Sequence, residues 1–179
     1  MKKKLLMWVA FLGLGMSSAV AQNYNNWAIG VKVGEPVGLN VRKYFDSGRK
    51  NFDLNFGTYG FLWGATRSHN NKPYYKSQTG LMVQGIFHWN NQLGAAERFQ
   101  VYYGFGGQIN SRKRVPPVSN NVPEKHISLG GVANTGMEYS LPNNDLSIFA
   151  ELGLYAEIAP KPLFIHIPAN VGIRLNLIK

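Results

Sequence analysis

The 179-residue chain contains no cysteine, so it has no disulfide to hold it together. Beyond its N-terminal region it has no apolar run approaching the ~18 residues of a transmembrane helix, which excludes helical spans there. Its four histidines show neither HxxxH nor HExxH spacing, and we expect no metal and no cofactor. An exported chain with these absences must rely on a core or on a closed network of backbone hydrogen bonds.

Residues 1–21 have the pattern of a secretory signal peptide. Three lysines directly after Met1 form the basic start, and an apolar core and an Ala-Val-Ala cleavage site follow. The apolar core is shorter than the ~20 residues that a membrane-spanning helix needs. We therefore expect cleavage after residue 21 and a single domain over 22–179. Because the chain is exported, its formal charge of +10 does not predict nucleic-acid binding.

Along most of the remaining chain, apolar and polar residues alternate with the period of two that is typical of β-strands. In the last stretch, for example, Val171 and Ile173 alternate with Gly172 and Arg174. Most segments reach the ~9–11 residues of a tilted membrane strand, so the sequence predicts an all-β, eight-stranded antiparallel up-and-down transmembrane β-barrel. Turn signals place the strands near 27–34, 36–45, 51–62, 76–90, 98–110, 126–141, 145–158 and 163–178.

Two of the connections are long, 63–75 and 111–125, and both lie at the same end of an antiparallel barrel. Long loops of bacterial barrels are extracellular, which predicts an outer-membrane protein with both termini in the periplasm. Basic residues cluster in these loops, and we expect them to contact anionic lipopolysaccharide head groups. Solvated loops that keep the chain soluble before insertion are the alternative. The candidate anion contacts are Arg67, Lys72, Lys76, Arg112, Lys113 and Arg114.

Aromatic residues gather on the outward, apolar face at the periplasmic ends of the first six strands. Rings concentrated at one rim predict an aromatic girdle at the membrane interface. The simpler alternative is the general enrichment of aromatic residues in strands. The predicted girdle comprises Trp27, Phe45, Phe52, Trp89, Phe99 and Tyr139.

The inward face carries glycines, amides and charged residues. Eight strands enclose a space that side chains fill, so we expect a filled lumen rather than an open pore. Because an unpaired buried charge is very costly, basic and acidic side chains on facing walls predict a buried ionic network. We expect Arg42 and Arg174 to pair with Glu138 or Glu151. Lys32 is expected nearer Glu157.

One constellation resembles a catalytic site. His126 and Ser128 lie two residues apart, with Glu138 on the same face, and this looks like the His/Ser/Glu site of outer-membrane lipid A deacylases. The pair is expected to face the lumen rather than lipid, however, and Leu129 stands where that family has asparagine. Glu138 also lies about 33 Å beyond Ser128 along a strand. We expect no enzymatic activity, and a lipid A-modifying enzyme remains an alternative.

With its leader, eight segments, inward glycines and two long loops, the mature chain resembles the small eight-stranded outer-membrane barrels of the OmpA/OmpX kind. The resemblance implies an up-and-down outer-membrane barrel, a class with diverse roles. Such barrels commonly end on an aromatic residue, whereas this chain ends on Lys179.

From the loops and the resemblance together we predict a non-enzymatic scaffold that presents basic loops to lipopolysaccharide or to a protein partner, within a larger outer-membrane complex or outside one. A soluble exported barrel that turns the same apolar face inward around an apolar ligand is a further alternative, because alternation alone does not exclude it.

Overall fold

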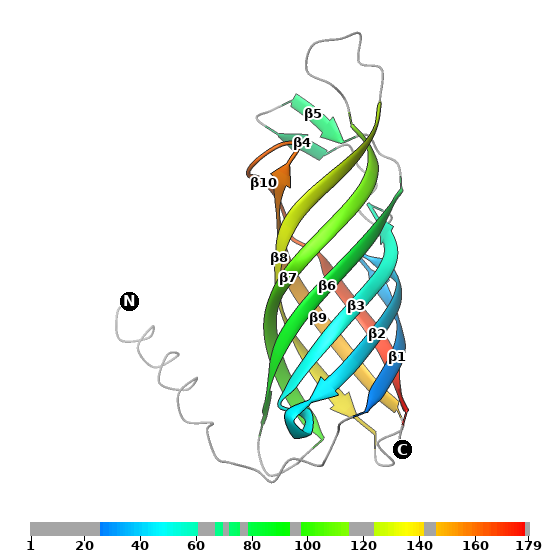
Figure 1. Ribbon diagram of the computed structural model, residues 1–179. Coiled ribbons are helices and arrows are strands. Elements are labelled where there is room, and N and C mark those ends of the chain that lie inside the picture. Colours follow the sequence, from blue (N-terminus) through cyan, green and yellow to red (C-terminus); the bar gives the residue numbers. More distant parts are fainter. Residues whose placement is uncertain are drawn as a thin grey trace, which may run out of the picture.

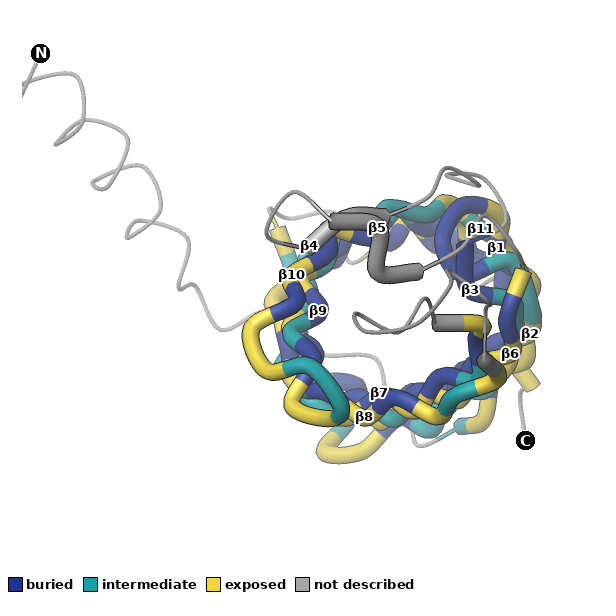
Figure 2. Tube along the Cα trace, turned by 90° about the horizontal axis from the view of Figure 1, so that it is seen from above, coloured by how far each residue is buried: buried dark blue, intermediate teal, exposed yellow. Residues whose placement is uncertain are grey.

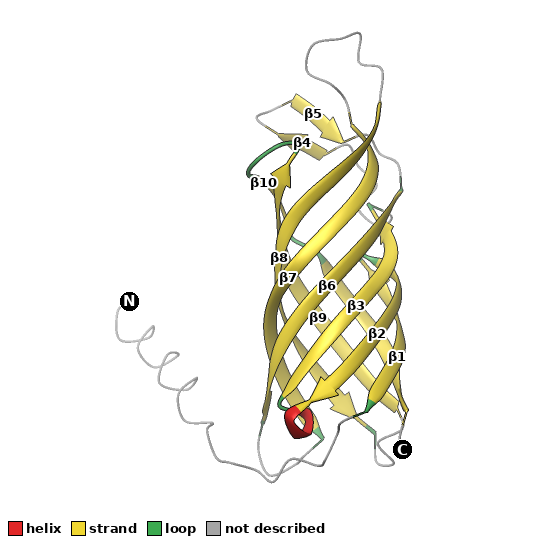
Figure 3. Ribbon diagram, in the orientation of Figure 1, coloured by secondary structure: helices red, strands yellow, loops and turns green. Residues whose placement is uncertain are grey.

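The structure is a closed antiparallel β-barrel (Figure 1). The computed structural model describes residues 26–60, 67–69, 72–75, 79–93, 98–114, 124–141 and 146–177. The predicted leader over 1–21 lies outside these ranges. Within them, no helix is both long enough and apolar enough to cross a bilayer. A 3-10 turn, η1 (Asp46–Gly48), is the helical element that stands out in Figure 3.

In the described part of the chain, eight strands form the wall, as predicted. Each pairs antiparallel with the next along the wall, and the first and last strands pair from Trp27 opposite Leu177 to Gly34 opposite Asn170, which closes the barrel. In order around the wall they are β1 (Trp27–Gly34), β2 (Val37–Phe45), β3 (Lys50–Tyr59), β6 (Gly80–Gln92), β7 (Phe99–Arg114), β8 (Glu124–Ser140), β9 (Leu146–Ala159) and β11 (Ala169–Leu177).

Three short strands lie at the end of the barrel opposite the one that carries η1 (Figures 1 and 3). β4 (Arg67–His69) and β5 (Lys72–Tyr75) pair with each other, and β5 joins β7 where Tyr75 faces Arg114. β10 (Phe164–His166) pairs with β9, as β11 also does. The predicted strand 163–178 is therefore interrupted, at Pro168, which has no N–H to donate to a ladder.

The two predicted long loops are shorter than the sequence suggested. The β7–β8 ladder continues up to Arg114 opposite Glu124, so the ends of the predicted loop 111–125 are strand. The predicted loop 63–75 contains β4 and β5. This long β7–β8 ladder makes one side of the barrel taller than the side formed by β1 and β2 (Figure 1).

The apolar face of the wall points outward and the polar face inward. On β11, Val171 and Ile173 are 57% and 47% exposed, whereas Arg174 between them and the terminus is fully buried. Viewed down the barrel, buried and exposed positions alternate along the strands (Figure 2). A soluble barrel with its apolar face inward is therefore wrong for this chain, and the arrangement is that of a membrane-spanning barrel.

The lumen is filled by side chains in two zones. Towards the end that carries β10 lies an apolar cluster of Tyr59, Met82, Ile86, Val132, Tyr155 and Phe164. Towards the end where Trp27 faces Leu177 lie the buried charged residues Arg42, Arg174 and Glu138, whereas Arg112 and His166 are buried against Tyr59 of the apolar cluster. Space between large side chains is made by inward glycines such as Gly106, where an added Cβ would collide with the carbonyl oxygen of Gly85.

Candidate functional site

The buried charges of the lumen centre on Glu138. One of its carboxylate oxygens accepts hydrogen bonds from Arg42 Nη1 at 2.7 Å and from Arg174 Nη1 at 2.5 Å. The other oxygen accepts the Tyr44 hydroxyl at 2.9 Å. These side chains come from β2, β8 and β11, so the contacts tie opposite walls of the barrel together.

Two further carboxylates complete the cluster. Asp53 accepts a two-point contact from Arg42, Nε to Oδ1 at 2.5 Å and Nη2 to Oδ2 at 2.8 Å. Glu151 accepts Lys32 Nζ at 3.2 Å and the Tyr102 hydroxyl at 2.7 Å. Bidentate Arg–carboxylate pairs are among the strongest hydrogen-bonded contacts in proteins.

We call this set the lumen ionic cluster. It balances three cations with three carboxylates, so each buried charge has an opposite charge within reach, as burial requires. Its charged members are Lys32, Arg42, Arg174, Asp53, Glu138 and Glu151.

The sequence predicted that four of the six charged members of the cluster pair with one another. It gave Lys32 the wrong partner and did not include Asp53. Lys32, expected nearer Glu157, bonds to Glu151 instead, and Glu157 accepts the backbone N–H of Lys161 at 3.1 Å. Asp53 was missed, although its neighbours Phe52 and Leu54 point outward and strand alternation therefore puts Asp53 inside.

A chain of amide hydrogen bonds runs around the lumen wall above the cluster. It starts at Arg174 Nε, which donates to Asn40, and each amide then donates its N–H to the oxygen of the next residue. The successive donor–acceptor distances are 2.7 Å for Arg174 to Asn40, 2.8 Å to Asn55, 2.9 Å to Gln84, 2.7 Å to Gln108, 2.8 Å to Asn110 and 3.2 Å to Ser128.

This amide ladder links β11, β2, β3, β6, β7 and β8 in one direction. Chains of hydrogen bonds polarise one another, so the ladder strengthens the register of neighbouring strands.

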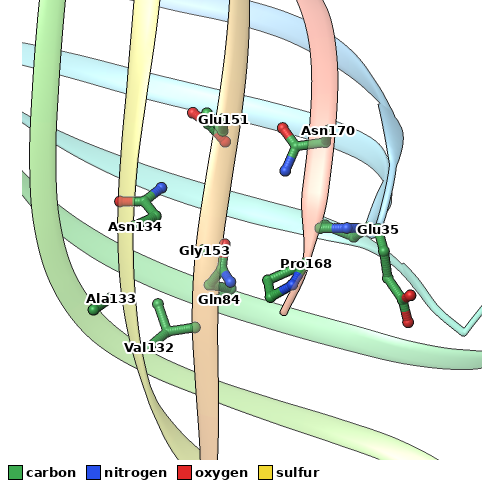
Figure 4. Close-up of a pocket in the computed structure, with 10 residues that line it drawn as sticks. Glu35, Gln84, Val132, Ala133, Asn134, Glu151, Gly153, Pro168 and Asn170 are labelled. Atoms are coloured by element: carbon green, nitrogen blue, oxygen red, sulfur yellow. The ribbon is translucent and has the colours of Figure 1, made fainter. Parts of the chain in front are cut away.

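Two small cavities lie beside these networks, each of about 10 Å³, which is room for a single water. In one of them, Glu151, Asn134 and Asn170 surround the space between β8, β9 and β11 (Figure 4). Cavities of this size do not form a conduit for hydrated ions.

The basic residues predicted in the loops separate into two groups. Arg112 was expected to contact anions at the surface, but it is buried, and its guanidinium lies 4.6 Å from the ring centre of Tyr59. The reason is strand alternation, because β7 continues past residue 110 and turns Arg112 into the lumen. Lys113, the next residue, is exposed.

Lys113 lies directly opposite Lys125 in the β7–β8 ladder, and both side chains are exposed on the outward face. We call this pair the basic rim. Just below it on the same face come Ile127 and, one step further, Ile109 opposite Leu129. No described side chain forms an ion pair with either lysine. Of the other candidates, Arg67 lies in β4, Lys72 in β5 and Arg114 in β7, and their side chains are not described. Lys76 lies outside the described residues.

The six aromatic residues predicted as a girdle point outward at the opposite end of the barrel. Register links several of them, since Phe45 faces Lys50, Lys50 faces Trp89 and Phe99 faces Tyr139. The ammonium of Lys43 lies 5.2 Å from the ring centre of Trp27, a cation–π contact at the same rim. Phe52 follows Lys50 on β3, two residues further along on the same face.

The His/Ser/Glu constellation is not assembled. The Ser128 hydroxyl accepts Asn110 Nδ2 at 3.2 Å and the Tyr155 hydroxyl at 3.5 Å, whereas Glu138 is engaged by two arginines in the ionic cluster. In such a site the nucleophile must hydrogen-bond to its base, and the base must hydrogen-bond to the group that orients it. Among the described residues, no three histidine, aspartate or glutamate side chains gather as a metal site.

No family model matches the sequence, and no curated protein matches it. The fold is similar to that of the N-terminal β-barrel domain of Pseudomonas aeruginosa OprF, with a TM-score of 0.59 and 11% identity over 87% of this chain and 100% of that one. It is similar to neisserial surface protein A, with a TM-score of 0.50 and 10% identity over 85% and 94%.

Yersinia pestis Ail in a bilayer nanodisc is a further match, with a TM-score of 0.49 and 10% identity over 86% and 99%. The similarity to the first two structures shows that this chain has the fold of the small eight-stranded outer-membrane barrels, as the sequence predicted.

Proposed function

We propose that this chain is an integral outer-membrane barrel that acts without catalysis, holding lipopolysaccharide phosphate at its basic rim. The apolar exterior and the charged interior support insertion in a bilayer. The aromatic end, with both termini, faces the periplasm in this proposal, and the tall β7–β8 end faces outward. Export through a leader over 1–21 is part of the same proposal.

The observation that carries the proposal is the direct pairing of Lys113 with Lys125. Like charges opposite each other on neighbouring strands repel, and an anion between them removes that repulsion. The pair stands immediately above the apolar band that ends at Ile109, Leu129 and Ile127, which is the level of lipid head groups. Lipid A phosphates are the anions found there in the outer leaflet.

Two observations support a role without catalysis. Ser128 is buried and its hydroxyl oxygen accepts hydrogen bonds from Asn110 and Tyr155 within the lumen, so it does not meet lipid. Glu138 accepts hydrogen bonds from Arg42 and Arg174, so its carboxylate is already engaged in the ionic cluster. A scaffold needs no reacting group, and the rigid lumen suits that role.

The test is lipid A binding to the detergent-solubilised barrel, followed by native mass spectrometry. The double variant Lys113→Gln/Lys125→Gln should bind bis-phosphorylated lipid A several-fold more weakly, and the effect should shrink at high salt because exposed charges are screened. Lys43→Gln, at the other rim, is the control and should bind as the unmodified protein does.

Dephosphorylated lipid A should not distinguish the variants. Equal binding of phosphorylated lipid A by the rim variant and the control would overturn the proposal. Retention of the heat-modifiable gel shift shows that each variant is folded.

A further inference from the structure

An apolar groove of about 460 Å³ runs along the outside of the barrel across β6, β7 and β8. Trp89, Tyr103 and Phe105 line it, and Ala133 contributes to it from β8. Tyr103 and Phe105 are exposed on the wall. The volume lies within the ~300–1,000 Å³ of ligand sites in proteins.

The aromatic side of the groove is built by packed rings. The ring centres of Trp89 and Tyr103 are 5.9 Å apart and nearly parallel, and Phe105 lies 5.4 Å from Trp89. Phe87 also packs edge-on against Trp89, with ring centres 5.1 Å apart. Because each ring is held by another, this side keeps its shape without a bound molecule.

The β8 side of the groove is low because its outward residues are small. The next outward residue after Ala133 is Thr135, whose hydroxyl donates to the carbonyl oxygen of Tyr102 at 3.0 Å. Two residues before Ala133 is Gly131, where an added Cβ would meet nothing within 4 Å. Packing of the barrel therefore does not require glycine at 131, and the small residues leave space beside the rings for something outside the chain.

Positive charge lies at the end of the groove that is nearest the predicted aromatic girdle. Lys50 is directly opposite Trp89 in the β3–β6 ladder and its side chain is 44% exposed. Arg49 and Lys50 share a single carboxylate, that of Asp46, at 2.6 and 3.2 Å. Two cations with one anion leave this turn with a net positive charge beside the groove.

We infer that this groove binds one acyl chain of a phospholipid whose phosphate lies beside Lys50. An apolar slot in the hydrocarbon-facing wall, next to a cationic turn at the aromatic rim, matches the two ends of such a lipid in shape and charge. The inference rests on insertion in a membrane, as the proposed function does. It does not depend on lipopolysaccharide binding, because the groove lies near the aromatic end of the barrel and not at the basic rim.

The experiment is native mass spectrometry of the full barrel released from micelles containing dipalmitoyl phosphatidylglycerol. Ala133→Phe fills the groove and should weaken lipid retention about tenfold. Ala150→Phe is the matched control, since Ala150 also lies on the outward face, on β9 opposite Met137 of β8, away from the groove. It should retain lipid as the unmodified protein does.

Two further arms separate chain from head group. Dihexanoyl phosphatidylglycerol, with the same head group and short chains, should be retained weakly by every variant. Lys50→Gln should weaken retention of the long-chain lipid, while Lys113→Gln/Lys125→Gln should not, which keeps this test distinct from the test of the proposed function. Should Ala133→Phe lose the heat-modifiable gel shift, Ala133→Leu takes its place.

Equal retention by the Ala133 and Ala150 variants would overturn the inference. So would a dimer that the Ala133 variant alone abolishes, because the occupant would then be a second copy of the chain.

Discussion

Replacing Glu138 by glutamine should destabilise the barrel strongly while leaving its shape unchanged. In the structure the Glu138 carboxylate accepts three hydrogen bonds, from Arg42, Arg174 and Tyr44. Glutamine has nearly the same volume but presents one oxygen and one N–H₂ group, and the latter would face a donor. The cluster would also hold three cations against two carboxylates.

The expected cost follows from the burial of both arginines, which are fully inaccessible to solvent. Breaking a buried ion pair by removing one partner typically costs about 3–5 kcal/mol, because the remaining charge is left uncompensated. Removing Arg174 as well, in Glu138→Gln/Arg174→Gln, restores the balance of charge. We therefore expect the double variant to be more stable than the sum of the two single effects predicts.

The assay is reversible urea unfolding of the barrel in phospholipid vesicles, followed by tryptophan fluorescence and gel mobility. Asp46→Asn removes an ion-paired carboxylate from the exposed β2–β3 turn and is the control, with a far smaller effect because exposed pairs contribute little. A free energy of unfolding for Glu138→Gln within about 1 kcal/mol of the unmodified protein would mean that the two buried arginines do not depend on the Glu138 carboxylate.

Three further perturbations test other parts of the structure. Gln84→Leu interrupts the amide ladder and should cost about 1–3 kcal/mol in the same unfolding assay, because its neighbours are left unsatisfied; no change would mean that the ladder contributes nothing. Gly106→Ala should impair folding, measured by gel shift, whereas Gly131→Ala should fold normally, since only the first added Cβ meets backbone; equal yields would contradict this. Hydrogen bonds from Arg49 and Lys50 lower the pKa of Asp46. The contribution of Asp46 to stability should therefore be present above the ordinary titration range of an aspartate and be lost as pH falls through the lowered pKa. A carboxyl NMR titration at the ordinary pKa would contradict the turn geometry.

Most of the fold could be predicted from strand alternation. A period of two assigns each residue to the inner or outer face, and β1 spans the residues predicted for it. The same rule places Arg42 and Glu138 inside. Ends of strands were harder, because β7 and β8 continue through basic, proline-flanked sequence that also suits a loop. Arg112 was misassigned for this reason, although its place in the alternation puts it inside.

Pairing inside the lumen depends on register and tilt, which composition does not reveal. Lys32 meets Glu151 because of how the strands are staggered around the closed wall, not because of distance along the chain. Asp53 was not predicted because its partner is on the neighbouring strand and not on the facing wall. It lies beside Arg42 on the neighbouring strand, where the β2–β3 register puts the two residues opposite each other.

The direction in which the two faces of the wall point can be measured in β11. The chain has no native cysteine, so single cysteines at 170, 171, 173 and 176 can each carry a nitroxide label while the ionic cluster stays intact. In phospholipid vesicles, labels at 171 and 173, on the apolar face, should collide freely with oxygen dissolved in the bilayer, and labels at 170 and 176, on the polar face, should be shielded from it. High oxygen accessibility at 170 and 176 with shielding at 171 and 173 would mean that the polar face meets the lipid.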